Sequence, residues 1–409
     1  MTRRLHFVLL LFLLSFLPFK SGASHLSGAE IYWEKINDDS FKLILRAYRD
    51  CNGVSLSSPS LDIGSFTCSI KESITMTKKN TYDITPTCAD QCSRCGTLGC
   101  SFKYGYEYTQ YEGILDVSVR RKNSCCQTRI SYTECCRSNT ITTGPSGNYY
   151  VESIVDVCIS GDNSSPIFNQ APLSVACLNH DFIYNLGASD SDMDSLKSKF
   201  TDSLSYSFTN PKINSILYVS WKNDYNYDEP LKYFGHPYAN LPLPKGIHLD
   251  PLTGELKLRP KQEEVTTVAI KVTEHRNGKK IGEVTRELQL VIFKCPRNRP
   301  PLLSGINNNP RSLFSIKSCP NKESCFFIKV SDPELTDTVY YKYKTNIPVL
   351  KDQPTTILKN GDSIKICFTP GLTTPDGLYY IDLSIEDNAC PIPGRASQRI
   401  SVDIGSSIK

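Results

Sequence analysis

The stretch that decides the fold is TTVAIKVTEHRNGKKIGEVTRELQLVIF, residues 266–293. It holds two β-rich runs, Thr266 to Glu274 and Lys280 to Phe293, on either side of Asn277-Gly278. That dipeptide supplies the positive φ angles that a tight hairpin turn needs. The sequence therefore predicts a long hairpin here, the clearest in the chain.

Strand patterns of the same kind extend in both directions. On the N-terminal side, Glu30 to Ile36 and Phe41 to Tyr48 flank a polar turn, and apolar residues recur at every second position from Phe41. On the C-terminal side, the prolines of CPRNRPPLL, Cys295 to Leu303, break any strand because they remove donors and fix φ. Five further short strands are expected at 325–330, 339–343, 362–368, 379–386 and 397–404. We expect an all-β chain of tandem β-sandwich (immunoglobulin-like) modules preceded by a disulfide-rich β domain.

The length and the composition of the chain suggest where these modules begin and end. The 409 residues exceed what one hydrophobic core usually organises. The segment 161–172 is rich in Asp, Asn, Ser and Pro and lacks periodicity, so we interpret it as a linker. The expected units are a cysteine-rich β domain at 24–160, an immunoglobulin-like or cadherin-like sandwich at 173–295 and an immunoglobulin-like sandwich at 296–409.

The first 23 residues have the pattern of a signal peptide. Arg3 and Arg4 precede an apolar run, Phe7 to Phe19, that is too short to span a bilayer, and small Ser21 and Ala23 precede the expected cleavage site. No later stretch approaches the roughly 18 apolar residues of a spanning helix. We therefore expect an exported protein without a transmembrane segment in the mature chain, at the cell surface or outside the cell, or in the periplasm without outer-membrane export.

Charge argues against a nucleic-acid partner. Removal of Arg3, Arg4 and Lys20 with the signal subtracts three positive charges and lowers the formal net charge from +4 to +1. No block of Lys and Arg remains to form an electrostatic footprint for nucleic acid or anionic lipid.

Seventeen cysteines behind a signal peptide indicate a disulfide framework formed in an oxidising compartment. The odd count leaves at least one thiol free, modified or paired with another chain. Cys177 and Cys295 bracket the second sandwich and are candidates for one bond, with Cys158 as the alternative partner of Cys177. In the third module, Cys325 and Cys367 are expected on the outward faces of their strands. A cross-strand disulfide is allowed there if the strands are antiparallel neighbours.

Two cysteine patterns carry further expectations. The cluster Cys88, Cys92, Cys95 and Cys100 has spacings that suit four thiolates around zinc, but export, the lack of histidine and the intervening glycines favour a disulfide-knotted loop. Adjacent residues of a strand point to opposite faces, so the pairs Cys125-Cys126 and Cys135-Cys136 are each expected to bond to two different partners.

Several strings resemble gliding-motility-associated, type IX secretion-linked bacterial surface proteins. These strings are SHLSGAEIYW (24–33), RAYRDCNG (46–53), ECCRSNTI (134–141), NSSPIF (163–168), LGASDSDMDSL (186–196), PLPKGIHLDPLTGEL (242–256) and EDNACPIPG (386–394). The resemblance implies a large adhesin-like surface molecule with immunoglobulin-like or cadherin-like modules. It also implies a C-terminal sorting domain, which is not recognisable before Lys409.

No motif of a known catalytic site stands out, and no histidine belongs to a compact ligand spacing. The leading hypothesis is a non-catalytic surface module protein, adhesin-like or structural, whose partners are other surface proteins or extracellular polysaccharide. The alternative is a secreted carbohydrate-active or hydrolytic protein with accessory sandwich modules. An exposed aromatic row or two facing carboxylates would favour the alternative, and a buried Trp33 and Trp221 would count against it.

Calcium is the one cofactor that the sequence suggests. Asp190, Asp192 and Asp194 alternate after Gly187 and offer hard oxygen ligands, although they do not form an EF-hand loop. Asp332, Glu334 and Asp337 form a comparable cluster in the third module. The competing interpretation is that these carboxylates accept hydrogen bonds from backbone amides in turns.

Overall fold

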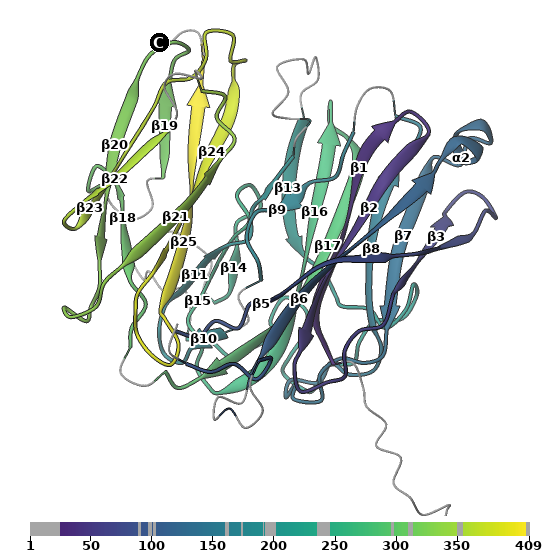
Figure 1. The fold of residues 1–409 in the computed structure, drawn as a ribbon, viewed down its shortest axis with the longest axis horizontal. Coiled ribbons are helices and arrows are strands. Elements are labelled where there is room, and N and C mark those ends of the chain that lie inside the picture. The colour runs from purple at the N-terminus through teal and green to yellow at the C-terminus, as the bar shows by residue number, and fades with distance from the viewer. Residues whose placement is uncertain are drawn as a thin grey trace, which may run out of the picture.

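The computed structural model describes residues 25–88, 91–96, 100, 104–159, 163–172, 175–190, 192, 202–234, 246–295, 298–309, 314–349 and 355–405. The predicted signal peptide at 1–23 lies outside these residues. Within them, the regular structure is β-strand except for one five-residue helix, α2 (Ser118–Lys122), which confirms the all-β class (Figure 1). No helix in the described ranges has the length and hydropathy to cross a bilayer.

The bounds of the strands follow. The first group is β1 (Leu26–Asn37), β2 (Ser40–Asp50), β3 (Ser60–Ser65), β4 (Glu72–Thr75), β5 (Thr77–Asp83), β6 (Tyr106–Asp116), β7 (Gln127–Glu134) and β8 (Tyr149–Asp156). The second is β9 (Ile167–Phe168), β10 (Val175–Cys177), β11 (Phe182–Asn185), β12 (Ala188–Ser189), β13 (Asp202–Phe208), β14 (His248–Leu249), β15 (Glu255–Leu258), β16 (Glu264–Arg276) and β17 (Lys279–Phe293). The third is β18 (Leu302–Ile306), β19 (Ser315–Ser318), β20 (Ser324–Ser331), β21 (Tyr340–Thr345), β22 (Thr356–Asn360), β23 (Ser363–Phe368), β24 (Gly377–Glu386) and β25 (Arg395–Ile404).

The predicted hairpin is β16 and β17. Asn277 and Gly278 have φ angles of 52° and 75°, and Arg276 pairs with Lys279 across the turn. Positive φ at both turn residues matches the twist of the flanking strands, which explains the Asn-Gly choice. The first predicted hairpin is also present as β1 and β2, so both hairpins predicted from periodicity are confirmed.

Strand β17 belongs to a 12-stranded sheet that includes strands from both sides of the predicted linker. It pairs with β16, and also with β1 through Gly28 to Glu30 and with β8 near Val284. Near the turn, Val284 joins a core built largely from β1, β2, β3, β6, β7 and β8. Towards its end, Leu288 and Leu290 join a second core with β11 and β15.

The division into separate domains at 24–160 and 173–295 is therefore wrong. Strand β17 is 15 residues long, which is longer than a strand of a single sandwich requires. Side chains on one of its faces contribute to both cores. The two predicted domains are one unit, which we call the N-terminal body (residues 25–295).

The interpretation of 161–172 as a linker is also wrong for its described part, 163–172. Its serines bind the backbone of β1: Ser165 Oγ accepts from Trp33 N at 3.0 Å, and Ser165 N donates to the Trp33 carbonyl at 2.8 Å. Phe168 is buried in the first core. Low periodicity here reflects a segment that packs along the edge of β1, so composition alone misidentified it.

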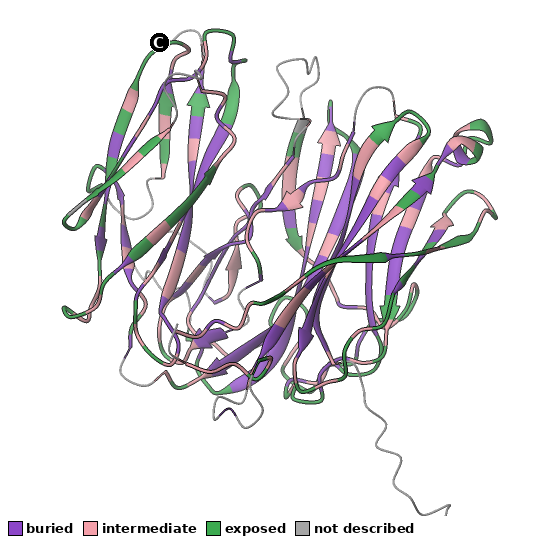
Figure 2. Ribbon diagram, in the orientation of Figure 1, coloured by how far each residue is buried: buried purple, intermediate pink, exposed green. Residues whose placement is uncertain are grey.

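Residues 302–404 form the third module, an immunoglobulin-like sandwich with its own core. One sheet has the order β18-β20-β23-β22 and the other β19-β25-β24-β21. All five strands predicted in this region are present, and β18, β19 and β22 are additional. Figure 2 shows buried and exposed positions alternating along its strands, as expected when one face of each sheet packs inward.

Candidate functional site

A cleft of about 710 Å³ lies between the N-terminal body and the third module. Its floor is the outward face of the sheet formed by β21, β24 and β25. Its wall is the segment 169–172 after β9, together with Tyr184 of β11 and two residues after β5, Ile84 and Pro86. The cleft thus depends on how the two units meet.

Strand register orders the side chains on the floor into three rows. Tyr340 pairs with Glu386, which pairs with Arg395, in the first row. Lys342, Ser384 and Ser397 form the second row, and Lys344, Asp382 and Arg399 form the third. Because alternate residues of a strand share a face, these nine side chains all point away from the core of the third module.

The third row anchors the N-terminal body. Asp382 is 2% exposed and accepts from Arg399 Nε at 2.7 Å and from Asn185 Nδ2 at 2.6 Å. Arg399 also donates to the carbonyl of Ala188. A Cβ at Gly187 would lie 2.5 Å from Arg399 Cζ, so only glycine lets the guanidinium approach so closely. The contact is buried and fully paired, which fixes the angle between the units.

A covalent link holds a second point of the junction. Cys88, which follows Ile84 and Pro86 on the wall, forms a disulfide with Cys390 of the third module across 302 residues of sequence. Cys88 N also donates to the Pro391 carbonyl at 3.1 Å. With the Asp382 contact, this bond attaches the module to the body at two places, so the cleft is preformed.

The accessible part of the cleft is aromatic and polar. Tyr340 is 58% exposed and Lys342 is exposed beside it, whereas Tyr343 pairs with the core residue Leu383 and lies on the opposite face of β21. The floor carboxylates Asp382 and Glu386 are each paired with an arginine, Glu386 with Arg395 at 2.7 Å. Aromatic faces beside paired polar groups suit stacking and hydrogen bonding to a polar ligand.

The structure places Asp190 and Asp192 next to a group that the sequence did not single out. Asp190 is 2% exposed, and its Oδ1 accepts from Asp192 N at 2.9 Å, as in a turn. Burial and these two aspartates raise the pKa of the fully buried Glu274 to about 9. Neither aspartate belongs to a described set of three ligand atoms within reach of one ion. Asp194 lies outside the described residues, so calcium at this position stays a prediction.

The cluster predicted in the third module has a different membership. Arg299 Nε donates to Glu334 Oε1 at 2.8 Å, so the Glu334 carboxylate already has a partner. The residue that completes the set is Asp387, whose ligand oxygen lies within 4.8 Å of those of Asp332 and Asp337. Asp387 is 55 residues further along the chain than Asp332, and only the fold brings the two together.

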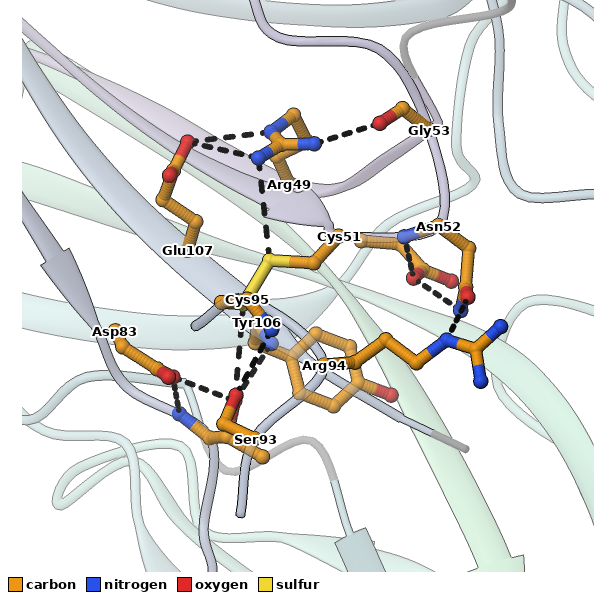
Figure 3. The surroundings of a disulfide bond; sticks show 12 residues. Arg49, Cys51, Asn52, Gly53, Asp83, Ser93, Arg94, Cys95, Tyr106 and Glu107 are labelled. Carbon is orange, nitrogen blue, oxygen red and sulfur yellow. Dashed lines mark hydrogen bonds and ion pairs between the residues drawn. A yellow bond between two sulfur atoms is a disulfide. The ribbon is translucent and has the colours of Figure 1, made fainter. Parts of the chain in front are cut away.

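The cysteine cluster proposed as a zinc alternative consists of disulfides. Cys51 joins Cys95, and next to this bond Arg94 donates to Asn52 and Arg49 donates to Gly53 (Figure 3). The other two bonds are Cys92–Cys100 and Cys88–Cys390. The four cysteines therefore have no free thiolates for a metal.

The adjacent pairs behave differently from each other. Cys125 bonds Cys68 and Cys126 bonds Cys158, so this pair has two different partners as predicted, although both residues precede the first residue of β7. The prediction for Cys135 and Cys136 is wrong, because these two bond to each other. They follow the last residue of β7, Glu134, so strand alternation does not govern them.

The remaining disulfides lie where the sequence analysis allowed them. Cys177 bonds Cys295, with a Cα separation of 5.3 Å. Cys325 and Cys367 are direct partners on antiparallel β20 and β23 and form the cross-strand bond. Among the described cysteines, Cys319 has no disulfide. Eight bonds indicate an oxidising compartment.

The two tryptophans do not form an aromatic platform. Trp33 is fully buried in the first core. Trp221 is half-buried, and its Nε1 donates to Asn210 Oδ1 at 3.1 Å. The exposed aromatic side chain on the floor of the cleft is Tyr340 of β21, which the sequence analysis counted only as part of a strand.

Comparison with known proteins gives no family. No family model matches the chain, and no curated protein does. Similar solved structures include a nucleoside hydrolase-related protein from Saccharophagus degradans (17% identity, 26% of each chain, TM-score 0.21). An I-band fragment of titin has 7% identity over 92% of this chain and 99% of its own, with a TM-score of 0.18. The EC1-4 fragment of Drosophila N-cadherin has 14% identity over 68% and 58%, with a TM-score of 0.20.

These values are too low to carry an argument about function, and the chain spans about a quarter of the first of these proteins. The sandwich assignment rests on the strand order and cores described above. The resemblance to gliding-motility-associated proteins rests on the sequence motifs alone.

Proposed function

We propose that the protein is a non-catalytic, exported surface module protein, adhesin-like, whose cleft binds an extended extracellular polysaccharide. The observation that carries the proposal is the cleft itself, preformed by the Asp382 contact and the Cys88–Cys390 bond. A preformed site binds without the entropic cost of ordering its walls. Exposed Tyr340 offers a ring to a sugar face, and Lys342 offers a donor to hydroxyl or carboxylate groups.

The absence of catalysis is part of the proposal. A glycosidase needs one carboxyl group that can donate a proton and a second that stays ionised. In the cleft, Asp382 is ion-paired with Arg399 and Glu386 with Arg395, so both floor carboxylates are already engaged by side chains of the protein. The described lining therefore offers no two free carboxylates for the hydrolytic alternative.

Binding can be tested with the full mature chain on immobilised and soluble polysaccharides. Tyr340→Ala combined with Lys342→Ala should weaken binding at least tenfold, because both side chains are exposed and the double variant leaves the core intact. Tyr227→Ala is the matched control, since Tyr227 is 39% exposed and lies outside the cleft lining. Equal binding by all three proteins, or release of reducing ends from the polysaccharide, would reject the proposal. Capture of a surface protein in place of a glycan would show that the partner is a protein and would reject the polysaccharide.

Location and route need a separate measurement. The motif resemblance motivates the proposal that the chain reaches the cell surface through a type IX system. Tagged protein should fractionate with the surface or the medium in cells with a working system and accumulate in the periplasm without it. An unchanged distribution would contradict that route and leave the binding proposal untouched.

A further inference from the structure

Three aspartates meet at the end of the third module that adjoins the N-terminal body. Asp332 and Asp337 lie in the loop between β20 and β21, and Asp387 follows β24. One ligand oxygen from each lies within 4.8 Å of the others. Calcium binds oxygen at about 2.3–2.6 Å, so two ligands of one ion are at most about 5 Å apart. We propose that Asp332, Asp337 and Asp387 bind one calcium ion.

Unsatisfied buried oxygens beside the three carboxylates point to the same ligand. Asn298 is 6% exposed, and its Nδ2 donates to Asp387 Oδ2 at 3.0 Å. Its Oδ1 is buried and accepts no hydrogen bond from the described residues. Asp332 Oδ2 is also buried and accepts no hydrogen bond from the described residues. A buried oxygen without a hydrogen-bond partner destabilises the folded state unless a ligand binds it. Both oxygens are acceptable calcium ligands.

The charges of the cluster are not neutralised by protein groups. No ion pair between described residues involves Asp332, Asp337 or Asp387, whereas neighbouring Glu334 is paired with Arg299. Three carboxylates held this close repel one another unless a cation or a proton intervenes.

The donor set selects the metal. The three carboxylates and the Asn298 amide supply only oxygen, which suits calcium and disfavours zinc, whose usual ligands are sulfur and nitrogen. Magnesium requires shorter bonds in near-ideal octahedral geometry and gives up its water reluctantly. Irregular loops with several carboxylates favour the larger ion.

The position of the cluster gives the ion a structural consequence. Asp387 Oδ1 accepts from Gly394 N at 2.9 Å, and a Cβ at Gly394 would lie 2.4 Å from Asp387 Oδ2. Between these residues lies Cys390, which carries the disulfide to the N-terminal body. Asn298 comes from the segment that connects the body to β18. An ion here therefore holds together the loops through which the two units are joined.

The test is calcium titration of the full mature chain, by calorimetry and by thermal unfolding with millimolar calcium, millimolar magnesium or chelator. Calcium should bind with a Kd of about 10⁻⁴–10⁻³ M and raise the midpoint of unfolding. Asp337→Asn should weaken binding at least tenfold, and so should Asp332→Asn. Asp387→Asn is less informative, because Asp387 also accepts from two backbone amides and its loss can unfold the loop.

Glu334→Gln is the matched control, because Glu334 lies in the same loop but binds Arg299. It should keep wild-type calcium affinity. No heat of binding and identical midpoints in calcium and chelator would overturn the proposal. Wild-type calcium affinity in both Asp332→Asn and Asp337→Asn would also overturn the proposal. If Asp192→Asn alone abolished binding, the ion would lie at the other aspartate cluster.

Discussion

The N-terminal body and the third module are both β-sandwich structures, but they are held together differently. The core of the third module consists of apolar side chains from alternate strand positions. In the body, an ion pair lies between two strands: Glu30 of β1 is opposite Arg286 of β17, and both are 0% exposed. The buried pair of the third module, Asp382 and Arg399, lies instead on its outer face against the body. Burial raises the pKa of Glu30, but Arg286 and Arg46 outweigh it and hold that pKa below its usual value. Apolar periodicity therefore describes a self-contained module, whereas a specific polar pair joins strands that contribute to two cores.

Breaking the buried pair should give the largest effect. Arg286→Met leaves the buried Glu30 with Arg46, at 3.9 Å, and the Tyr48 hydroxyl as partners. It also removes the contacts of Arg286 with the Phe168 ring and the Gln170 carbonyl. We expect a loss of about 3–5 kcal/mol in the free energy of unfolding, measured by denaturant titration. Arg395→Met, which breaks the part-exposed pair with Glu386, should cost less than about 1 kcal/mol. Similar losses in the free energy of unfolding for the two variants would refute the contrast between the buried and the part-exposed ion pair.

The second prediction concerns the bond between the units. Cys88→Ala with Cys390→Ala should lower stability by about 2–5 kcal/mol and let the third module unfold as a separate calorimetric transition. Cys325→Ala with Cys367→Ala is the comparison, because that bond closes 42 residues within one module. It should lower the stability of the module without uncoupling it from the body. A single transition in the first variant would show that the Asp382 contact suffices to couple the units.

The smallest effect is a pH dependence that belongs to the body. The pKa of Glu274 is about 9 in the folded chain, raised by burial and by Asp190 and Asp192, against 4.5 as its usual value. The folded state therefore binds one more proton between these pH values, and stability falls as pH rises from about 4.5 to 9. Glu274→Gln should remove this decline and stabilise the chain by on the order of 2 kcal/mol at pH 7, with little change at pH 4. Asn163 and Arg276 remain as neighbours in the variant. Parallel stability-pH curves for variant and wild type would contradict the assignment.

The candidate sites were predictable to different degrees. Asp332 and Asp337 are close in sequence, and their spacing alone suggested a cluster. Glu334 shares that spacing but binds Arg299, and no sequence pattern announces the partner. Tyr340 was expected in a strand, but its place on the floor of a cleft follows from the way the N-terminal body packs on that sheet.

The sequence by itself determined the β class, the two hairpins and the strands of the third module, because alternation and turn residues act locally. It also determined the oxidised framework, since cysteine count and an apparent signal peptide imply it. Only the tertiary structure decided that β17 unites two cores and that residues 163–172 pack along β1. It also brought Asp387 to the other two aspartates. These outcomes depend on contacts between residues tens to hundreds of positions apart, and such contacts leave no periodic trace in the chain.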